Sequence, residues 1–181
     1  MIRLLSTAMI GLFLMLSQAW ADQHDPRLNI LFTKLQAAEE DADADRLVSA
    51  IWAIWLLGEN DRVSQRLALG TALFQKSRFD QALGIFDQVI RDYPDFSEAW
   101  NKRATLYYVM GRLDESLQDV EKTISLEPRH FGALAGAAQI YMAQERWEEA
   151  LQAYRQATRV NPHLYGADKV ISNLEEKLKG I

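Results

Sequence analysis

The side chains best suited to chemistry in this 181-residue chain are three histidines and several pairs of adjacent carboxylates. His130 and His163 lie near two similar proline-containing turns, and a metal ion bridging these turns would need both. His24 lies near the start of the chain. No HxxxH or HExxH spacing would bring two ligands to one helix face. We therefore expect His130 and His163 in surface turns, with a two-histidine metal site as the alternative.

The carboxylates also have a simple structural explanation. Asp114-Glu115 and Glu148-Glu149 fall where helices are predicted to start, and acidic side chains favour the positive end of the helix dipole. The acidic run 39–45 is predicted to be a solvated turn, because the glycine and distal glutamate of a calcium loop are missing. The sequence contains no glycine-rich phosphate loop, GxSxG or CxxC motif. We therefore predict no catalytic residues, no cofactor and no metal.

Three evenly spaced prolines indicate that the chain contains an internal repeat. Pro94, Pro128 and Pro162 are evenly spaced, and other columns keep the same step, which is typical of repeat architectures. The repeats are 63–96, 97–130 and 131–164. Small residues recur at Gly70, Ala104 and Ala138, and at Ala82, Ser116 and Ala150. Large apolar residues recur at Leu73, Tyr107 and Tyr141, at Phe79, Leu113 and Trp147, and at Phe86, Val120 and Tyr154.

Each repeat is predicted to be a pair of helices. Turn residues divide each unit, and the resulting segments contain no internal proline, which would break a helix. The predicted pairs are 61–76 with 79–91, 97–109 with 113–126, and 131–143 with 147–160. Close approach of the two helices is allowed by the small residues, and the large apolar residues fill the spaces between them.

The repeats resemble the tetratricopeptide family. In the second repeat the matching residues are Trp100, Ala104, Tyr107, Gly111, Ser116 and Pro128, and in the third they are Leu134, Ala138, Tyr141, Trp147, Ala150, Tyr154, Ala157 and Pro162. The resemblance implies a right-handed superhelix of helix hairpins with a concave binding groove. Arg66 and Arg103 depart from it, because the family has apolar residues there. Segments 100–105 and 128–134 also resemble uncharacterised exported tetratricopeptide proteins of alphaproteobacteria.

The flanking segments complete an all-α solenoid. Residues 22–62 have helical spacing without the full repeat pattern and are predicted to form a divergent N-terminal hairpin. Its stretch 51–57, with Trp52 and Trp55, is apolar on nearly every side. We expect a core helix between the first helix and the first repeat, with an exposed partner patch as the alternative. Residues 165–181 are predicted to form the C-terminal capping helix that a solenoid needs.

The first 21 residues have the pattern of a secretory signal. Arg3 supplies a positive charge, residues 4–16 are largely apolar, and Ala19-Trp20-Ala21 fits a cleavage site. Cleavage would leave Asp22 first, in a protein without stable membrane insertion; a retained N-terminal anchor is the alternative. The net charge of −5, which becomes −6 without Arg3, argues against a nucleic-acid partner. Export to a bacterial periplasm is expected.

The resemblance also implies where a partner binds, because inward positions on the first helix of each repeat line the groove. The residues predicted to form the partner site are Thr71, Phe74, Asn101, Thr105, Tyr108, Gln139 and Met142. Phe74, Tyr108 and Met142 share one column and would form an apolar stripe, unless they only pack internally. A carboxylate clamp for peptide C-termini is not expected, because only Lys102 fits its positions.

These observations predict a non-catalytic scaffold that binds a protein or peptide partner in the cell envelope. Two alternatives remain at this stage. The protein could be a structural scaffold that self-associates through the Trp52/Trp55 hairpin or through the groove. It could also be a small-ligand or metal-dependent enzyme that uses His130 and His163.

Overall fold

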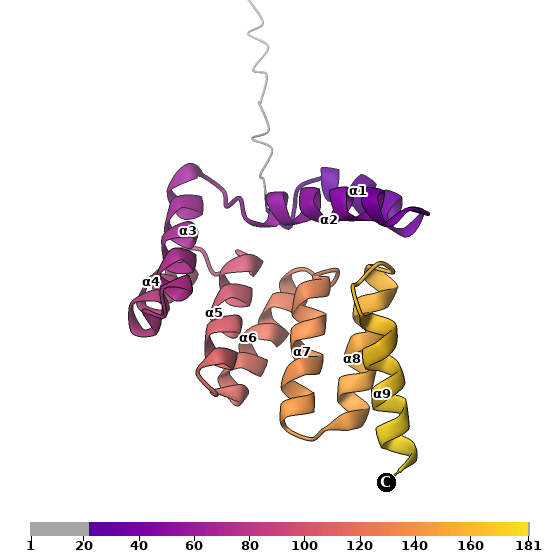
Figure 1. Cartoon of the computed structure of the whole chain (residues 1–181). Coiled ribbons are helices and arrows are strands. Elements are labelled where there is room, and N and C mark those ends of the chain that lie inside the picture. Colours follow the sequence, from indigo (N-terminus) through magenta and orange to yellow (C-terminus); the bar gives the residue numbers. More distant parts are fainter. Residues whose placement is uncertain (1–21, 181) are drawn as a thin grey trace, which may run out of the picture.

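The computed structural model describes residues 22–180, so the predicted signal segment 1–21 lies outside the described residues. The described part of the chain contains nine helices and no strand. They are α1 (Arg27–Gln36), α2 (Asp41–Trp55), α3 (Asp61–Gln75), α4 (Phe79–Asp92), α5 (Ser97–Val109), α6 (Leu113–Leu126), α7 (Phe131–Ala143), α8 (Trp147–Val160) and α9 (Ala167–Lys179). Each predicted helix of the repeats ends within one residue of the observed helix. The fold is the all-α repeat solenoid that the sequence predicted (Figure 1).

The turn inside each repeat has the same backbone conformation. Ser77, Gly111 and Glu145 have φ of 56°, 75° and 58°, and they occupy the same position in successive repeats. A left-handed residue directly after a helix ends it, because the chain can no longer continue the helical hydrogen bonds. Only Gly111 adopts this conformation without a steric penalty, since Ser77 and Glu145 carry a Cβ.

Small residues hold the two helices of a repeat close together. At Gly70 on α3, an added Cβ would lie 2.5 Å from a ring carbon of Phe86 on α4, so the ring packs directly on the backbone. In the next repeat the buried Ser116 hydroxyl donates a 2.7 Å hydrogen bond to the carbonyl of Ala104. Gly70 and Ala104 occupy the same position in successive repeats. At the first the helices are held close by contact with an aromatic ring, and at the second by a hydrogen bond.

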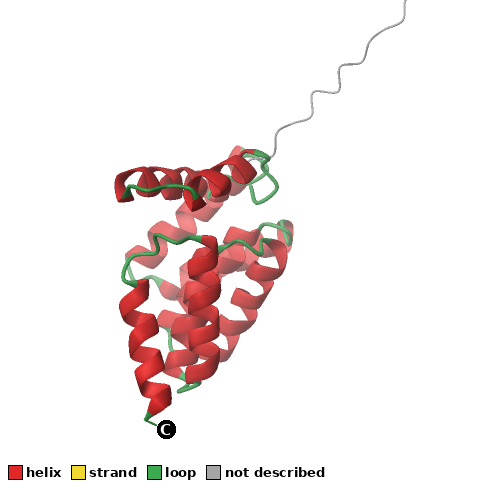
Figure 2. Cartoon of the chain, turned by 90° about the vertical axis from the view of Figure 1, so that its right-hand side faces the viewer, coloured by secondary structure: helices red, strands yellow, loops and turns green. Residues whose placement is uncertain are grey.

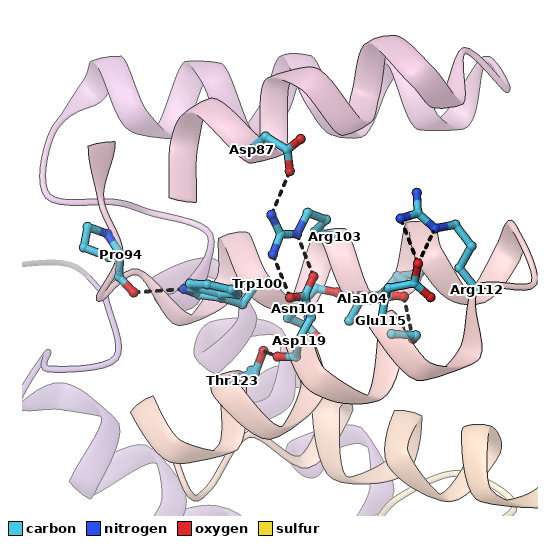
Figure 3. Close-up of polar contacts among 12 residues, drawn as sticks. Asp87, Pro94, Trp100, Asn101, Arg103, Ala104, Arg112, Glu115, Asp119 and Thr123 are labelled. Atoms are coloured by element: carbon cyan, nitrogen blue, oxygen red, sulfur yellow. Dashed lines mark hydrogen bonds and ion pairs between the residues drawn. The ribbon is translucent and has the colours of Figure 1, made fainter. Parts of the chain in front are cut away.

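Arg103 stands where the family has an apolar residue, and its side chain connects three helices (Figure 3). Its guanidinium, on α5, donates to both carboxylate oxygens of Asp119 on α6, at 2.7 and 2.8 Å, and to Asp87 on α4 at 2.7 Å. It also lies over the rings of Trp100 and Tyr107. Burial would lower the pKa of Arg103, but the bonds to Asp119 and Asp87 raise it above its ordinary value.

Arg66, the other departure from the family pattern, joins α3 to α4. Its guanidinium bonds to Asp92 at 2.5 Å and to Gln88 at 3.2 Å. Both arginines are therefore accommodated by polar partners on neighbouring helices, and the local packing is preserved.

The N-terminal hairpin does not lie where we expected it. The helix with Trp52 and Trp55 was predicted to pack between the first helix and the first repeat. Instead, α1 and α2 lie across the ends of the repeats, at a steep angle to their helices (Figures 1 and 2). Trp55 packs on Phe131 at the start of α7. The prediction of a covered core helix was correct for one face of α2 and for its contact with α1, but the second neighbour is the start of α7 and not the first repeat.

The hairpin and its leading residues contact all three turns that follow the second helices of the repeats. The Gln23 side chain bonds to the Asp95 carbonyl, ahead of α5, and to Ser97, the first residue of α5. Arg129, ahead of α7, donates to Asn29 at 2.7 Å. At the third turn, His163 bonds to the carbonyl of Ala38 at 3.1 Å and Gln36 bonds to the carbonyl of Arg159 at 3.3 Å. These contacts tie the hairpin to the whole row of repeats.

At the other end, α9 closes the solenoid by packing on the last repeat. Leu174 is buried, with Val170 and Ile171 half-buried beside Trp147. Lys177 lies over the Trp147 ring, with 4.5 Å between its Nζ and the ring centroid.

Candidate functional site

Helices α5 and α7 bring four of the seven predicted partner-site residues together. A cavity of about 70 Å³ lies between these helices. Its lining includes the predicted residues Asn101, Thr105, Tyr108 and Gln139. The floor is apolar, with Ala104, Val120 and Ile140. An uncharged polar rim over an apolar floor is suited to contacts with a polypeptide.

The rim residues differ in how much a ligand could reach them. Thr105 and Gln139 are exposed, and Tyr108 exposes 36% of its surface. The Thr105 hydroxyl donates to the carbonyl of Asn101 at 2.9 Å, so its oxygen still has acceptor capacity. Asn101 is only 8% exposed, and its amide donates to Glu98 Oε2 at 2.9 Å. The open part of the site is therefore formed mainly by Thr105, Tyr108 and Gln139.

The other three predicted residues do not join this cavity. Phe74 packs against Phe79, with 5.9 Å between ring centroids, and the Thr71 hydroxyl donates to the carbonyl of Leu67. Met142 lines a separate cavity of about 260 Å³ beside Trp147 and α9. The expected apolar stripe through Phe74, Tyr108 and Met142 is therefore interrupted, because its outer members are used in packing.

Two glycines on α7 have different surroundings. An added Cβ at Gly132 would lie 2.8 Å from Trp52 Cη2, so the indole packs directly on this part of the groove. At Gly136 the nearest atom would be Val120 Cγ2, at 4.0 Å. The hairpin therefore occupies the Gly132 end, and the open section lies around Gly136.

A buried polar cluster that the sequence did not predict joins the hairpin to the repeats. His130 is fully buried, in contrast to the surface turn that we expected, and its ring stacks on Trp55 with centroids 4.2 Å apart. The amide of Ala133 donates to His130 Nδ1 at 3.0 Å, which caps α7. Since Nδ1 accepts this bond, the proton is on Nε2, which donates to Glu98 Oε2 at 2.9 Å.

Glu98 is fully buried, yet its neighbours favour the ionised carboxylate. Burial would raise the pKa of Glu98, but the His130 hydrogen bond and the Lys102 charge lower it below its ordinary value. Lys102 Nζ lies 2.9 Å from Glu98 Oε1 and 5.7 Å from the centroid of the Trp52 ring. The lysine at the clamp-like position is thus already engaged within the protein.

His163 has a separate structural role. Its ring bonds to the Ala38 carbonyl and lies 3.4 Å from Asp41, at the far end of the hairpin. Among residues 22–180, no group of three or more histidine or acidic side chains is arranged to hold a metal ion. His130 and His163 therefore fasten different parts of the hairpin.

One indirect signal for the missed cluster was present in the sequence. Glu98 is three residues, about one helical turn, before the predicted groove residue Asn101, and His130 directly precedes the predicted helix 131–143, where a side chain can cap the first turn. Neither position, however, indicates that a tryptophan from a segment far upstream packs on these two residues. Only the placement of the hairpin brings Trp55 to this pair.

Comparison with known proteins identifies the repeat pattern. A family model described as tetratricopeptide repeat matches residues 67–124 and 101–164, together more than half of the chain. A tetratricopeptide-repeat protein of Rhizobium etli is 31% identical over 95 residues, which are 52% of this chain and 47% of the relative. The chain therefore spans about half the length of this relative.

Solved structures show the same fold at low sequence identity. The first tetratricopeptide domain of Spaghetti (RPAP3), bound to an HSP90 peptide, superposes with a TM-score of 0.62 at 16% identity, over 65% of this chain and 93% of that domain. The type III secretion chaperone SycD of Yersinia enterocolitica, in complex with a peptide of the translocator YopD, superposes with a TM-score of 0.61 at 13% identity, over 65% of this chain and 95% of that chain.

None of the helices between residues 22 and 180 has the length and apolar character needed to cross a bilayer.

Proposed function

Because this chain belongs to the tetratricopeptide-repeat family, we propose that it is a non-catalytic module that binds a segment of a protein partner between α5 and α7. The observation that carries this proposal is the open, uncharged rim of Thr105, Tyr108 and Gln139 around an apolar-floored cavity. A polypeptide supplies backbone hydrogen-bonding groups for the rim and small side chains for the floor.

Tyr108 is suited to be the main contact residue. Its ring combines a large apolar surface with a hydroxyl, and such side chains contribute strongly to protein interfaces at low entropic cost. Gly136, on the opposite helix, leaves the backbone of α7 open to close approach. Both solved structures described above contain bound peptides, which supports a polypeptide ligand.

The bound segment is expected to be internal to its protein. Lys102 is the only residue that fits a carboxylate clamp, and its ammonium group already pairs with Glu98. Recruiting it to a peptide terminus would leave the buried Glu98 carboxylate with less compensation, which is costly. Amidation of a peptide's C-terminus should therefore leave its affinity unchanged.

We further propose that the protein is exported and acts in the periplasm, with Asp22 as the first residue after cleavage. This rests on the sequence of residues 1–21. Cell fractionation followed by N-terminal sequencing checks it: a mature protein that begins at Asp22 in the periplasmic fraction is expected. Retention of residues 1–21 in the membrane fraction would instead establish the anchored form.

Photo-crosslinking in cells tests the binding site. A photo-reactive phenylalanine analogue replaces Tyr108 or Gln139, and matched controls carry it at Gln118 on α6 or Glu176 on α9, which are exposed elsewhere. Adducts with one protein from positions 108 and 139 only are expected. Equal adducts from all four positions would contradict a groove, and adducts with a second copy of this chain would favour the self-associating scaffold.

A further inference from the structure

Helix α9 buries the same positions as the first helices of the last two repeats. The repeat interval, which separates Pro128 from Pro162, also separates buried residues of α7 from buried residues of α9. The recurring buried residues are Ala99 and Leu106 on α5, Ala133 and Ile140 on α7, and Ala167 and Leu174 on α9. Because equivalent positions of a helix point in the same direction, α9 turns the same face to the groove as α5 and α7 do. The three helices follow one another along the solenoid (Figure 1).

The cavity beside α9 is the repeat equivalent of the cavity between α5 and α7. Four residues that line the cavity between α5 and α7 are Tyr108, Gly136, Gln139 and Ile140. One repeat interval later stand Met142, Val170, Asn173 and Leu174, and all four line the cavity beside α9. The two cavities are therefore successive openings of one groove, one on each side of α7. We call them the first subsite and the second subsite.

The two subsites differ in size and in lining. The first subsite has a volume of about 70 Å³ and opens beside Gly136. The second subsite has a volume of about 260 Å³, and the half-buried side chains of Met142 and Trp147 line it. Lys177 is the single charged residue of this lining, and its Nζ lies 4.5 Å from the centroid of the Trp147 ring. The first subsite therefore admits a small side chain, and the second admits a large apolar one.

A column of uncharged polar residues connects the subsites. Thr105, Gln139 and Asn173 occupy the same position on α5, α7 and α9, and all three are exposed. Hydroxyl and amide groups at regular intervals can bond to the backbone of an extended polypeptide, whose N–H and C=O groups need partners. A bound helix would satisfy its own backbone groups and leave this column unused. The column therefore favours an extended ligand.

The distance between the subsites sets the spacing of the side chains that fill them. The axes of packed helices are about 8–10 Å apart, so the centres of two openings on either side of α7 are separated by about the same distance. An extended chain in the polyproline II conformation has about three residues per turn and rises about 3.1 Å per residue. Its residues i and i+3 therefore point the same way and lie about 9 Å apart.

We propose that the partner segment crosses α7 in an extended conformation, with a small side chain in the first subsite and a large apolar side chain, three residues away, in the second. This proposal rests on the proposed function, because it assigns a sequence pattern to the segment that binds between α5 and α7. It also gives α9 a role in recognition besides closing the solenoid.

Crosslinking in cells measures the spacing directly. The photo-reactive phenylalanine analogue replaces Asn173 in one variant and Tyr108 in another, and mass spectrometry maps the adduct sites on the partner. We expect one partner protein and adduct sites within about five residues of each other. Adducts from position 108 without adducts from position 173, or adduct sites in distant segments, would overturn this proposal and leave the proposed function standing. No adducts from positions 108 and 139 would contradict the proposed function as well.

Peptide selection tests the second subsite without knowledge of the partner. A phage-displayed library of random dodecapeptides is selected on the purified protein, and the enriched peptides should share a small residue and a large apolar residue three positions apart. Met142→Gln should weaken these peptides about tenfold, and Asn173→Ala about threefold. Leu69→Gln changes an exposed residue of α3 outside both subsites and is the control. Thermal melts verify that each variant is folded.

A double-mutant comparison separates contact from folding. Met142→Gln should not further weaken a peptide whose large apolar residue has been replaced by alanine, because the contact is already lost. Equal weakening of both peptides, or binding that survives Met142→Gln, would overturn the second subsite. Enriched peptides that Tyr108→Ala does not weaken would contradict the proposed function itself.

Discussion

The repeats and the N-terminal hairpin are both built from antiparallel helices, but they are held in place differently. Within the repeats, each helix packs on its sequence neighbours through columns that recur from one repeat to the next. The hairpin is held by a single set of contacts, among them Trp55 on His130, that no other described part of the chain reproduces. Periodic contacts therefore define the fold, whereas unique contacts define how an appendage is placed on it.

Trp55→Ala should have the largest effect on stability, because it removes the side chain at the centre of the contacts that hold the hairpin. Trp55 is fully buried against His130 and Phe131, and truncating a buried tryptophan typically costs about 3–5 kcal/mol. We expect the hairpin to detach while the repeats remain helical. Urea denaturation followed by circular dichroism measures the loss, and hydrogen exchange shows whether protection disappears from α1 and α2 first.

The conservative change Trp55→Phe serves as its control. The Trp55 indole N–H has no hydrogen-bond partner among the described residues, so phenylalanine loses surface area but no hydrogen bond. Trp55→Phe should therefore lower the free energy of unfolding clearly less than Trp55→Ala does. Uniform loss of protection in all helices of Trp55→Ala would contradict a separately held hairpin.

Arg103→Leu tests whether the repeats also depend on unique contacts. The change restores the residue typical of the family but leaves Asp119, which is nearly buried, without its cation. Removing one member of a buried ion pair usually destabilises by about 3–5 kcal/mol, and the part-exposed Asp87 should reduce this toward about 2 kcal/mol. Chemical denaturation measures it, and adding Asp119→Leu should restore much of the loss.

Gly132→Ala and Gly136→Ala form a matched pair on α7. Both gain helix propensity of up to about 1 kcal/mol, but the Cβ at 132 meets Trp52, and such overpacking costs about 1–3 kcal/mol. We expect Gly132→Ala to lose about 1 kcal/mol and Gly136→Ala to gain up to about 1 kcal/mol. Thermal melts measure the difference, and equal melting temperatures would mean that Trp52 moves aside freely.

Acid should weaken the attachment of the hairpin, because Glu98 becomes protonated. This is the smallest of the expected effects, since it is absent near neutral pH. Its pKa is lowered in the folded protein, so its contribution is complete above the ordinary value of 4.5 and is lost as the pH falls through the lower folded pKa. Glu98→Gln should flatten the stability profile below pH 4.5. Glu115→Gln is the comparison: the hydrogen bond from Arg112 also lowers the pKa of Glu115, but this pair is part-exposed and screened by water, so the profile should flatten much less.

Much of the fold could be predicted because periodic residues specify it. Pro94 and its two successors marked the repeat boundaries, and the helices ended within one residue of their predicted positions. The burial of His130 could not be predicted, because it depends on Trp55, which approaches from a distant segment. A histidine before a helix equally indicates an exposed turn when the neighbouring chain is unknown.

The candidate site was predicted in part for the same reason. Thr105, Tyr108 and Gln139 were identified from their columns, which fix the direction in which a side chain points. Columns do not show what covers that side chain, and so they missed the packing of Met142 beside α9 and of Phe74 on Phe79. The two ends of the groove differ from its centre through neighbours that the repeat pattern does not contain.

The contacts of the hairpin with the turns of all three repeats have a consequence for folding. A simple repeat array can unfold stepwise from its ends, because each unit depends only on the next. Here, His163 bonds to Ala38 across 125 residues, and Gln23 bonds to Ser97 across 74. These links close long loops, which slows folding but joins distant units into one cooperative transition. As long as Trp55 keeps the hairpin attached, the protein should therefore behave thermodynamically as a closed ring rather than as an open chain of units; Trp55→Ala should open that ring.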